Sequence, residues 1–281
     1  MAKVAVIRGI DPQRVTVEAL ESVEAQEALQ GGGPVLVKPN YINARHPSTG
    51  ITTDGRVVEG VIKFLRRHGV QDIVIGEGGG LPDTFKAFRV AGVDAVAERW
   101  NVRLVDLNKD EFVEVHPPRP LALRRVKIAK TALESTIISV PKLKLHRIAG
   151  VTLSIKNMMG AMTPKGSMHT NLSRKIADLA SVIKPSIAVI DGIIAGEGHE
   201  TSVDPVEMNL VIAGRDPVAV DAVGAAVMGV SPRTVKHLLY AERIGLEPCN
   251  LDEIEVVGSP LEEVMRKFRR SLSSRVLSFL A

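Results

Sequence analysis

The feature that most constrains the fold is an alternation of short apolar runs with longer amphipathic stretches. Residues 4–7, 34–38 and 72–76 have the length and the valine and isoleucine content of buried strands. Stretches between them, such as 54–68, carry apolar residues three and four positions apart, as on one face of a helix. Strands that alternate with helices are typical of α/β proteins. We therefore predict an α/β fold with a mixed, largely parallel sheet and helices on both faces.

The same pattern predicts the remaining elements. Strands are expected at 102–106, 112–115, 126–129, 137–140, 150–155, 187–191, 210–213 and 254–257. Helices are expected at 15–29, from Pro82 onwards, and at 172–183, 217–228, 233–243 and 261–276. The middle strands follow one another without long helices, which predicts a small β-rich insertion at about 107–135 within a single domain, 1–281. The last helix carries an apolar stripe that would pack on the domain or on a second subunit, so a homodimer is left open.

Composition narrows the classes of function. Aromatic residues make up only 3% of the 281 residues, so the core must consist of Val, Ile, Leu and Ala. The net charge of +4 suits an anionic ligand but is too small to indicate nucleic acid. With two Tyr, one Trp and six Phe, basic residues are not interleaved with aromatic residues that could stack on bases. We expect no nucleic-acid partner.

Cysteine content and hydropathy help to predict the cellular compartment in which the protein works. Cys249 is the only cysteine, so no disulfide forms within the chain and no iron–sulfur cluster is held by this chain alone. The sequence shows neither the apolar stretch of a signal peptide nor a run of about 18 apolar residues. A cytoplasmic protein with no membrane partner is predicted. Many Arg and Glu with few Gln give a composition typical of thermophilic proteins.

Polar residues follow two of the predicted parallel strands. Lys38 and Asn40 lie at the end of one strand, and Glu77 and Gly78 begin a glycine-rich turn after another. Ligands of open α/β sheets bind beyond the carboxyl ends of the strands, where these residues would meet an anion. The turn matches neither a dinucleotide-binding fingerprint nor a phosphate-binding loop. A flexible turn and a solvated lysine are the alternatives.

Two segments alternate polar and apolar residues, which is the richest signal in the chain. If 141–146 and 151–156 are strands, each presents one polar and one aliphatic face. The polar faces, and the donors that follow them, would comprise Lys142, Lys144, His146, Thr152, Ser154, Lys156, Asn157, Lys165 and His169. This density of donors predicts a ligand cradle. The alternative is the solvent-facing side of an antiparallel sheet.

Carboxylates gather later in the chain. Asp191 ends a predicted strand and Glu197 follows in an acidic loop, where they could hold a divalent metal such as Mg²⁺. A solvated loop is the alternative. Asp216 precedes Pro217 and is predicted to cap a helix. Asp221 lies on that helix, which is otherwise apolar around nearly its whole circumference. Its carboxylate should therefore either pair with a cationic side chain or belong to the polar site.

In this order, the segments resemble the family called domain of unknown function 362. The matching stretches are 37–40, 52–54, 76–78, 140–146, 154–160, 191–192, 197–198 and 214–221. The resemblance implies an intracellular, prokaryotic-type protein. Members are sometimes joined to iron–sulfur modules of the ferredoxin type, which one cysteine cannot supply here. Members often continue with Asn-Gly-Pro after Glu197-Gly198, whereas this chain has His199-Glu200-Thr201, so its ligand could differ.

These observations lead to one principal hypothesis. The chain is expected to be an enzyme that acts on a small anionic metabolite, a carboxylate or a phosphate, by proton transfer at carbon, as racemases and lyases do. Lys156 or His146 would transfer the proton. The substrate would be bound by Lys38, Asn40, Lys142, Lys144, Ser154, Asn157, Glu77 and Gly78. Lys38, Glu77, Lys156, Asp191 and Glu197 are expected to line one cleft. The alternative function is a non-catalytic binding or assembly partner of an iron–sulfur protein.

Overall fold

The computed structural model describes residues 1–29, 32–80 and 83–270. Within them, a large sheet runs in the order β13-β1-β12-β11-β7-β2-β3-β4, and β8 and β9 extend it beside β11. Its strands are β1 (Ala2–Arg8), β2 (Val35–Pro39), β3 (Ile73–Glu77), β4 (Arg103–Asp106), β7 (Thr136–Val140), β8 (Lys142–His146), β9 (Gly150–Thr152), β11 (Ile187–His199), β12 (Ser202–Gly214) and β13 (Ile254–Gly258).

Most strand pairs in the large sheet are parallel. β7, β2, β3 and β4 run parallel to their neighbours, and β11 runs parallel to both β7 and β8. β12 is antiparallel to β1 and to β11. The prediction of a mixed, largely parallel sheet is confirmed.

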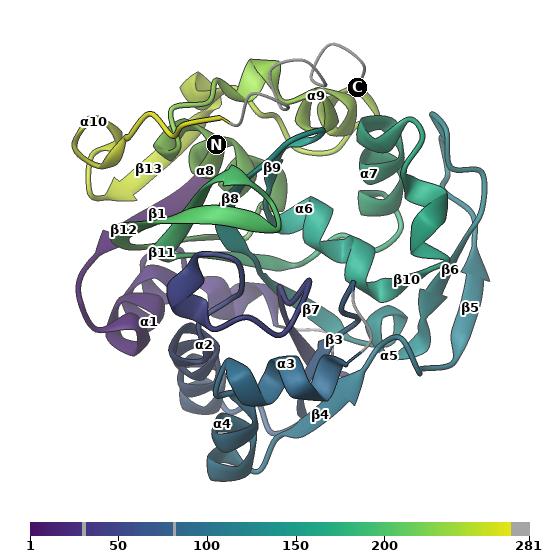
Figure 1. The fold of residues 1–281 in the computed structure, drawn as a ribbon, viewed down its shortest axis with the longest axis horizontal. Coiled ribbons are helices and arrows are strands. Elements are labelled where there is room, and N and C mark those ends of the chain that lie inside the picture. Colours follow the sequence, from purple (N-terminus) through teal and green to yellow (C-terminus); the bar gives the residue numbers. More distant parts are fainter. Residues whose placement is uncertain (30–31, 81–82, 271–281) are drawn as a thin grey trace.

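Helices cover both faces of this sheet, as predicted (Figure 1). The helices are α1 (Pro12–Ser22), α2 (Gly55–Arg67), α3 (Thr84–Val90), α4 (Val93–Trp100), α5 (Lys130–Leu133), α6 (Ser154–Asn157), α7 (Leu172–Ala180), α8 (Pro217–Val227), α9 (Lys236–Arg243) and α10 (Leu261–Val264). Alternate residues of the central strands enter two separate cores. In β2, Val35 and Val37 pack with α1 and α2, whereas Leu36 packs in the core that contains α7 and α8.

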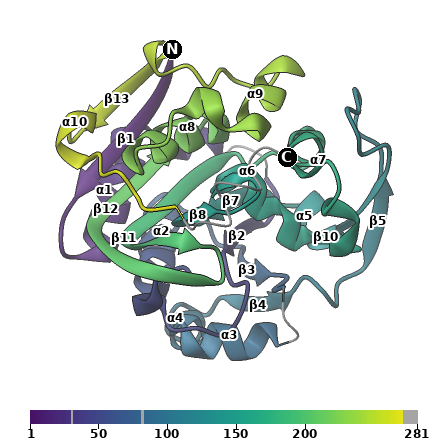
Figure 2. The ribbon, with the colours of Figure 1, turned by 45° about the horizontal axis from the view of Figure 1, so that its top comes forward.

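The middle of the chain forms a second, smaller sheet. β5 (Phe112–Val115) and β6 (Val126–Ala129) are antiparallel, and β10 (Met162–Thr163) joins the other edge of β6. Figure 2 shows this sheet at the periphery, beyond α5 and α7. β5 and β6 lie where the sequence predicted a β-rich insertion, whereas β10 comes from outside that range, and the division into domains stays a prediction.

One expected strand near the site ends earlier than predicted. The strand expected at 150–155 stops at Thr152, and α6 begins two residues later. The reason is Asp221, whose carboxylate accepts the backbone N–H of Ser154 at 2.6 Å and of Ile155 at 3.0 Å. These contacts satisfy the free donors of a helix start. Asp221 therefore neither pairs with a cation nor joins the polar site, and Ser154 and Lys156 do not share a strand face with Thr152.

The segment expected to hold an acidic loop is part of a long hairpin. β11 continues from the predicted strand to His199 and turns directly into β12 (Figure 2). Glu197 is therefore a strand residue. At the N-terminal side, the helix expected at 15–29 ends at Ser22, because Glu24 takes a left-handed conformation with φ of 51°.

The helix expected at 261–276 also differs from the prediction. Only Leu261–Val264 are helical, and the next residues extend along α8. Arg266 N–H donates to the carbonyl oxygen of Val227, and Phe268 N–H to that of Met228. These tertiary hydrogen bonds replace those a helix would make, while Phe268 still enters the core. Residues 271–276 lie outside the described part of the chain.

Within the described residues, no helix is long and apolar enough to cross a membrane. The predicted helix cap at Asp216 is confirmed, and Asp54 is found to cap α2. The side chain of Asp54 accepts the N–H of Arg56 at the start of α2, and Asp216 accepts those of Val218 and Ala219 at the start of α8.

Candidate functional site

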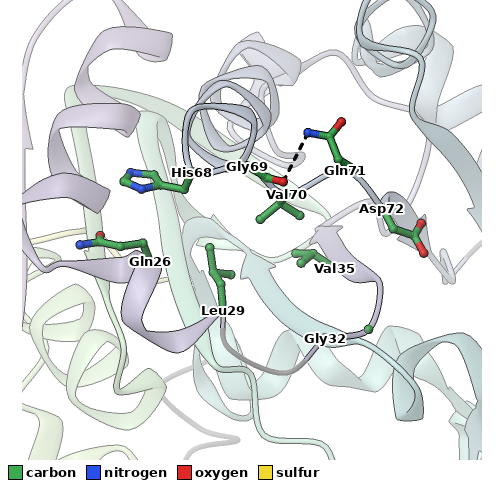
Figure 3. Close-up of a pocket in the computed structure, with 10 residues that line it drawn as sticks. Gln26, Leu29, Gly32, Val35, His68, Gly69, Val70, Gln71 and Asp72 are labelled. Atoms are coloured by element: carbon green, nitrogen blue, oxygen red, sulfur yellow. Dashed lines mark hydrogen bonds between the residues drawn. The ribbon is translucent and has the colours of Figure 1, made fainter.

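Pockets of opposite character lie at the two ends of the strands. The first lies at the amino ends of β2 and β3 and is lined by Gln26, Leu29, Gly32, Gly33, Val35, His68, Gly69, Val70, Gln71 and Asp72 (Figure 3). These residues include no Lys or Arg. The side-chain amide of Gln71 is already bonded to the carbonyl oxygen of Gly69. The described lining therefore offers little to bind an anion.

The second pocket lies beyond the carboxyl ends of β2, β3 and β8 and has a volume of about 700 Å³. It is lined by Asn40, Tyr41, Ile42, Asn43, Glu77, Gly78, Gly80, Lys144, His146, Arg147, Ile148, Thr152, Lys156, Asn157, Met159, Gly160, Lys165, Gly166, His169, Leu172, Glu200 and Thr201. Seven of the predicted site residues are among them: Asn40, Glu77, Gly78, Lys144, His146, Lys156 and Asn157. This is the edge where open α/β sheets bind ligands.

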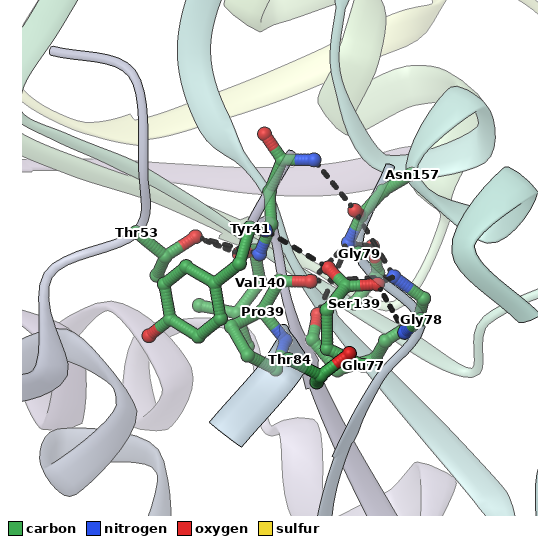
Figure 4. Close-up of polar contacts among 12 residues, drawn as sticks. Pro39, Tyr41, Thr53, Glu77, Gly78, Gly79, Thr84, Ser139, Val140 and Asn157 are labelled. Carbon is green, nitrogen blue, oxygen red and sulfur yellow. Dashed lines mark hydrogen bonds and ion pairs between the residues drawn. The ribbon is translucent and has the colours of Figure 1, made fainter. Parts of the chain in front are cut away.

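Glu77 organises one side of this pocket. Its carboxylate accepts Lys38 Nζ at 2.8 Å, the N–H of Tyr41 at 3.0 Å and the N–H of Gly78 at 2.7 Å (Figure 4). Lys38 is fully buried behind it, and burial lowers the pKa of Lys38 while Glu77 opposes this shift. Glu77 and Lys38 thus neutralise each other and form a rigid wall.

Asn157 joins α6 to this wall. Its Nδ2 donates to the carbonyl oxygen of Lys38 at 3.0 Å, and its Oδ1 accepts Lys38 Nζ at 3.3 Å and Asn40 Nδ2 at 3.1 Å (Figure 4). One side chain therefore joins the turn after β2 to the end of α6, next to Lys156. Positions held by several hydrogen bonds stay in place when a ligand binds.

The wall leaves no room for a side chain at Gly160. A Cβ atom there would overlap Glu77 Oε1 and lie only 2.5 Å from Lys38 Nζ. We expect Gly160→Ala to lower the free energy of unfolding by about 1–3 kcal/mol, since it forces the buried ion pair apart. Gly166→Ala is the control, because Gly166 lines the same pocket and a Cβ atom placed on it would meet nothing within 4 Å. Urea denaturation measures both, and equal stability of the two variants would contradict the packing described.

Lys156 is the unpaired cation of the pocket. Among the described residues, its ammonium makes neither a hydrogen bond nor an ion pair, and burial lowers the pKa of Lys156 to about 8. Lys144 lies on β8 nearby and donates to the carbonyl oxygen of Ile51 at 2.8 Å. Burial, together with the charges of Lys156 and Lys142, lowers the pKa of Lys144 to about 7. Both amines are therefore ready to exchange protons near neutral pH.

His146 is held as one neutral tautomer. Its Nδ1 accepts the backbone N–H groups of Ile148 at 3.2 Å and Ala149 at 3.1 Å, so the proton of the neutral ring is on Nε2. Burial and the nearby charges of Lys156 and Lys144 hold the pKa of His146 well below its usual value. At pH 7 the ring is thus a hydrogen-bond donor through Nε2 rather than a base.

The tip of the β11–β12 hairpin supplies the acidic residue of this end of the pocket. Glu200 accepts the backbone N–H of Arg147 at 3.1 Å, and its Oε1 lies 3.1 Å from Arg147 Nε and 3.9 Å from His146 Nε2. The negative charge of Glu200 also raises the pKa of Lys156, whereas burial lowers it. Glu200 therefore sets the charge balance around Lys156.

Polar atoms without a partner also border the pocket. Among the described residues, Thr152 Oγ1, Asn40 Oδ1 and Asn43 Oδ1 are buried and make no hydrogen bond. Buried polar groups are normally satisfied, because an unsatisfied one costs about 1–3 kcal/mol. These three atoms leave unused hydrogen-bonding capacity in residues that line the pocket.

The remaining predicted site residues do not line this pocket. Lys142 Nζ lies 2.6 Å from Asp191 Oδ2, and both side chains are fully buried. Asp191 also accepts the N–H groups of Asp54 and Ile193. This pair therefore supports the loop before α2, and burial raises the pKa of Asp191.

Glu197 lies elsewhere and is engaged differently. Its carboxylate accepts both the backbone N–H and the Nε of Arg269, at 2.8 and 2.6 Å. The structure thus does not place Asp191 and Glu197 in one cation site. No group of three or more His, Cys, Asp and Glu that could hold a metal ion occurs in the described residues. Of the five residues expected to converge, Glu77 and Lys156 line this pocket, Lys38 is buried behind Glu77, and the other two lie elsewhere.

The sequence assigned no site role to Glu200 or Arg147, whereas Lys165 and His169, which were predicted in the ligand cradle, line the pocket. A signal for Glu200 was present, because apolar residues alternate over 206–210 and could have paired with the preceding strand as a hairpin. The tip of that hairpin is the only source of carboxylate at this end of the described lining.

The fold and the site together define an open α/β protein with a basic pocket beyond the carboxyl ends of its strands. The chain belongs to the family described as domain of unknown function (DUF362), whose model matches residues 35–226. The resemblance read from the sequence is confirmed.

Two further similarities accompany this result. The chain is 24% identical over 255 residues to the thylakoid-associated protein sll1697 of Synechocystis sp., a match that covers 86% of this chain and 77% of that protein. Its fold is similar to that of the lactate racemase apoprotein of Thermoanaerobacterium thermosaccharolyticum, with a TM-score of 0.52 and 12% sequence identity. That match covers 75% of this chain and 54% of the racemase, so the chain spans about half the length of that protein.

Proposed function

We propose that the protein is an enzyme that moves a proton at a carbon atom of an anionic substrate. The observation that carries the proposal is Lys156, an unpaired lysine on the lining of a polar pocket, whose pKa burial lowers to about 8. A lysine in this state is a base of suitable strength near neutral pH. The shared fold with a lactate racemase adds support at the level of fold alone.

The other residues of the pocket fit definite roles in this reaction. Lys144 Nζ would donate a hydrogen bond to the substrate carboxylate, and the neutral amine of Lys156 would take the proton from the adjacent carbon. The electron pair of the broken C–H bond moves onto the carboxylate or carbonyl group. His146 Nε2–H would donate a hydrogen bond to the oxygen that gains this charge. Return of the proton from Lys156 to carbon restores the free amine.

Solvent isotope exchange tests the proposal. Lactate and other 2-hydroxy, 2-oxo and 2-amino acids would be incubated in D₂O with the protein, and loss of the C–H signal followed by proton NMR. We expect exchange of at least one acid, with kcat/KM rising as the pH passes through about 8, where Lys156 loses its proton. Lys156→Met should not exchange.

The same experiment distinguishes an enzyme from the alternative, a non-catalytic binding or assembly protein. If anions bind but no C–H exchanges at any pH from about 6 to 10, a range that spans the titration of the pocket lysines, the protein is a binding protein and the enzymatic proposal is wrong. A stable complex with an iron–sulfur protein of the ferredoxin type, formed with the pocket empty, would favour the role of assembly partner. That role, like a cytoplasmic location, stays a prediction.

A further inference from the structure

The basic groups of the pocket form two separate sets. The first set lies at β8 and α6 and comprises Lys144, His146, Arg147 and Lys156, with Glu200 among them. The second set comprises Lys165 and His169, which follow β10 in the chain. The proton-transfer proposal uses only the first set, so the second has no assigned role.

Contacts place Lys165 of the second set on the far side of Glu77, and His169 lines the same pocket. Lys165 Nζ is bonded to Asn108 Oδ1, and Asn108 Nδ2 donates to the carbonyl oxygen of Gly79 at 3.1 Å. Asn108 follows β4 and Gly79 follows β3, so Lys165 lies against the loops at that edge of the sheet. The charges that act on Lys165 are those of Glu77, Lys38 and Asp106, whereas the charge that acts on Lys156 is that of Glu200.

The sheet order gives the separation of the two sets. β8 takes the place of β7 beside β11, and β2 and β3 follow as the next strands in that direction. Neighbouring strands are about 4.8 Å apart, so β8 and β3 are about 10 Å apart. Two anionic groups on one ligand could therefore meet the two sets separately.

The volume agrees with a ligand that spans this distance. A pocket of about 700 Å³ lies in the range that holds ligands of drug size. This volume is well above the volume that a three-carbon acid fills. Two partly buried cationic sets in such a pocket are stabilised only when anions approach both of them.

We infer that the pocket takes a ligand with two anionic groups, a carboxylate at Lys144 and Lys156 and a second carboxylate or phosphate at Lys165 and His169. The inference rests on the proposed function, because it names the substrate class for the same pocket. The remote anion would supply binding energy and hold the reacting carbon beside Lys156.

Calorimetric titration of matched anions tests this inference without requiring any reaction. The pairs are glutarate with butyrate, and 3-phosphoglycerate with glycerate, so that each dianion has a partner that lacks one charge. In the wild type we expect at least one dianion to bind about tenfold or more tightly than its partner, since a charge-assisted hydrogen bond is added. The pair that shows the larger ratio identifies the second group as carboxylate or phosphate.

Two variants locate the effect. Lys165→Gln should lower the ratio to about one to two while leaving the monoanion affinity unchanged, because the remote charge is lost. Lys109→Gln is the matched control, because the Lys109 side chain is 75% exposed and does not line the pocket, and it should keep the wild-type ratio. Equal affinities of both members of each pair in the wild type, or a ratio that survives in Lys165→Gln, would overturn the inference while leaving proton transfer at Lys156 untouched. If no anion binds, both proposals fail.

Discussion

Lys156→Met should stop proton exchange and at the same time make the fold more stable. Loss of a general base lowers the rate by about 10²–10⁴. The stability gain follows because the native state keeps a buried ammonium that nothing in the described residues pairs with, and its pKa falls from 10.5 to about 8. Each pKa unit corresponds to about 1.4 kcal/mol, and partial exposure of the side chain reduces the total to about 1–3 kcal/mol.

The pH dependence of this gain has a definite sign. Below pH 8 the lysine is charged in both states, so the native state carries the whole penalty and the variant has its full advantage. Between pH 8 and 10.5 the native lysine is neutral while the unfolded one is still charged, so the wild type recovers. Thermal melts at about pH 7 and about pH 10, on either side of the native pKa, check this. A variant less stable than the wild type at the lower pH would mean that Lys156 has a partner in the fold.

Lys142→Met should cause the largest loss of stability, about 3–5 kcal/mol. It leaves the carboxylate of Asp191 fully buried without its cation, with only the N–H groups of Asp54 and Ile193 as donors. The double variant Lys142→Met/Asp191→Asn should recover more than half of the loss, because an amide oxygen still accepts a backbone N–H and carries no charge.

An exposed ion pair provides the matched control. Arg269 is 74% exposed where it pairs with Glu197, so Arg269→Met should lower the free energy of unfolding by no more than about 1 kcal/mol. Guanidinium denaturation of the three variants gives the comparison. If Lys142→Met lost no more than Arg269→Met, Asp191 would have another counter-charge, and its assignment as a structural partner of Lys142 would be wrong.

Local patterns predicted the architecture well, for a physical reason. The parallel strands are buried on both faces, so they are short apolar runs, and the capping residues Asp54 and Asp216 mark their helices by chemistry that acts over three residues. The same patterns predicted Glu77 and Lys156 at the carboxyl edge of the sheet and Lys144 and His146 on one strand face, and all four line the pocket there.

What the sequence did not predict depends on contacts between distant residues. α6 begins because Asp221, more than sixty positions away, accepts two of its N–H groups. The segment after α10 is extended rather than helical because the carbonyl oxygens of Val227 and Met228 accept its N–H groups. Likewise, Asp191 and Glu197 look alike in sequence as acids near the end of one strand, and only the fold gives them Lys142 and Arg269 as separate partners.

The account depends most on the state of Lys156, which can be measured without knowing the substrate. NMR titration of protein labelled with ¹³C at lysine Cε, with the signal assigned by its loss in Lys156→Met, gives the pKa directly. The account predicts a value of about 8 in the free protein and a higher value once a carboxylate ligand binds. A value near 10.5 that does not respond to any anion would contradict it, because Lys156 would then be a solvated side chain outside any site.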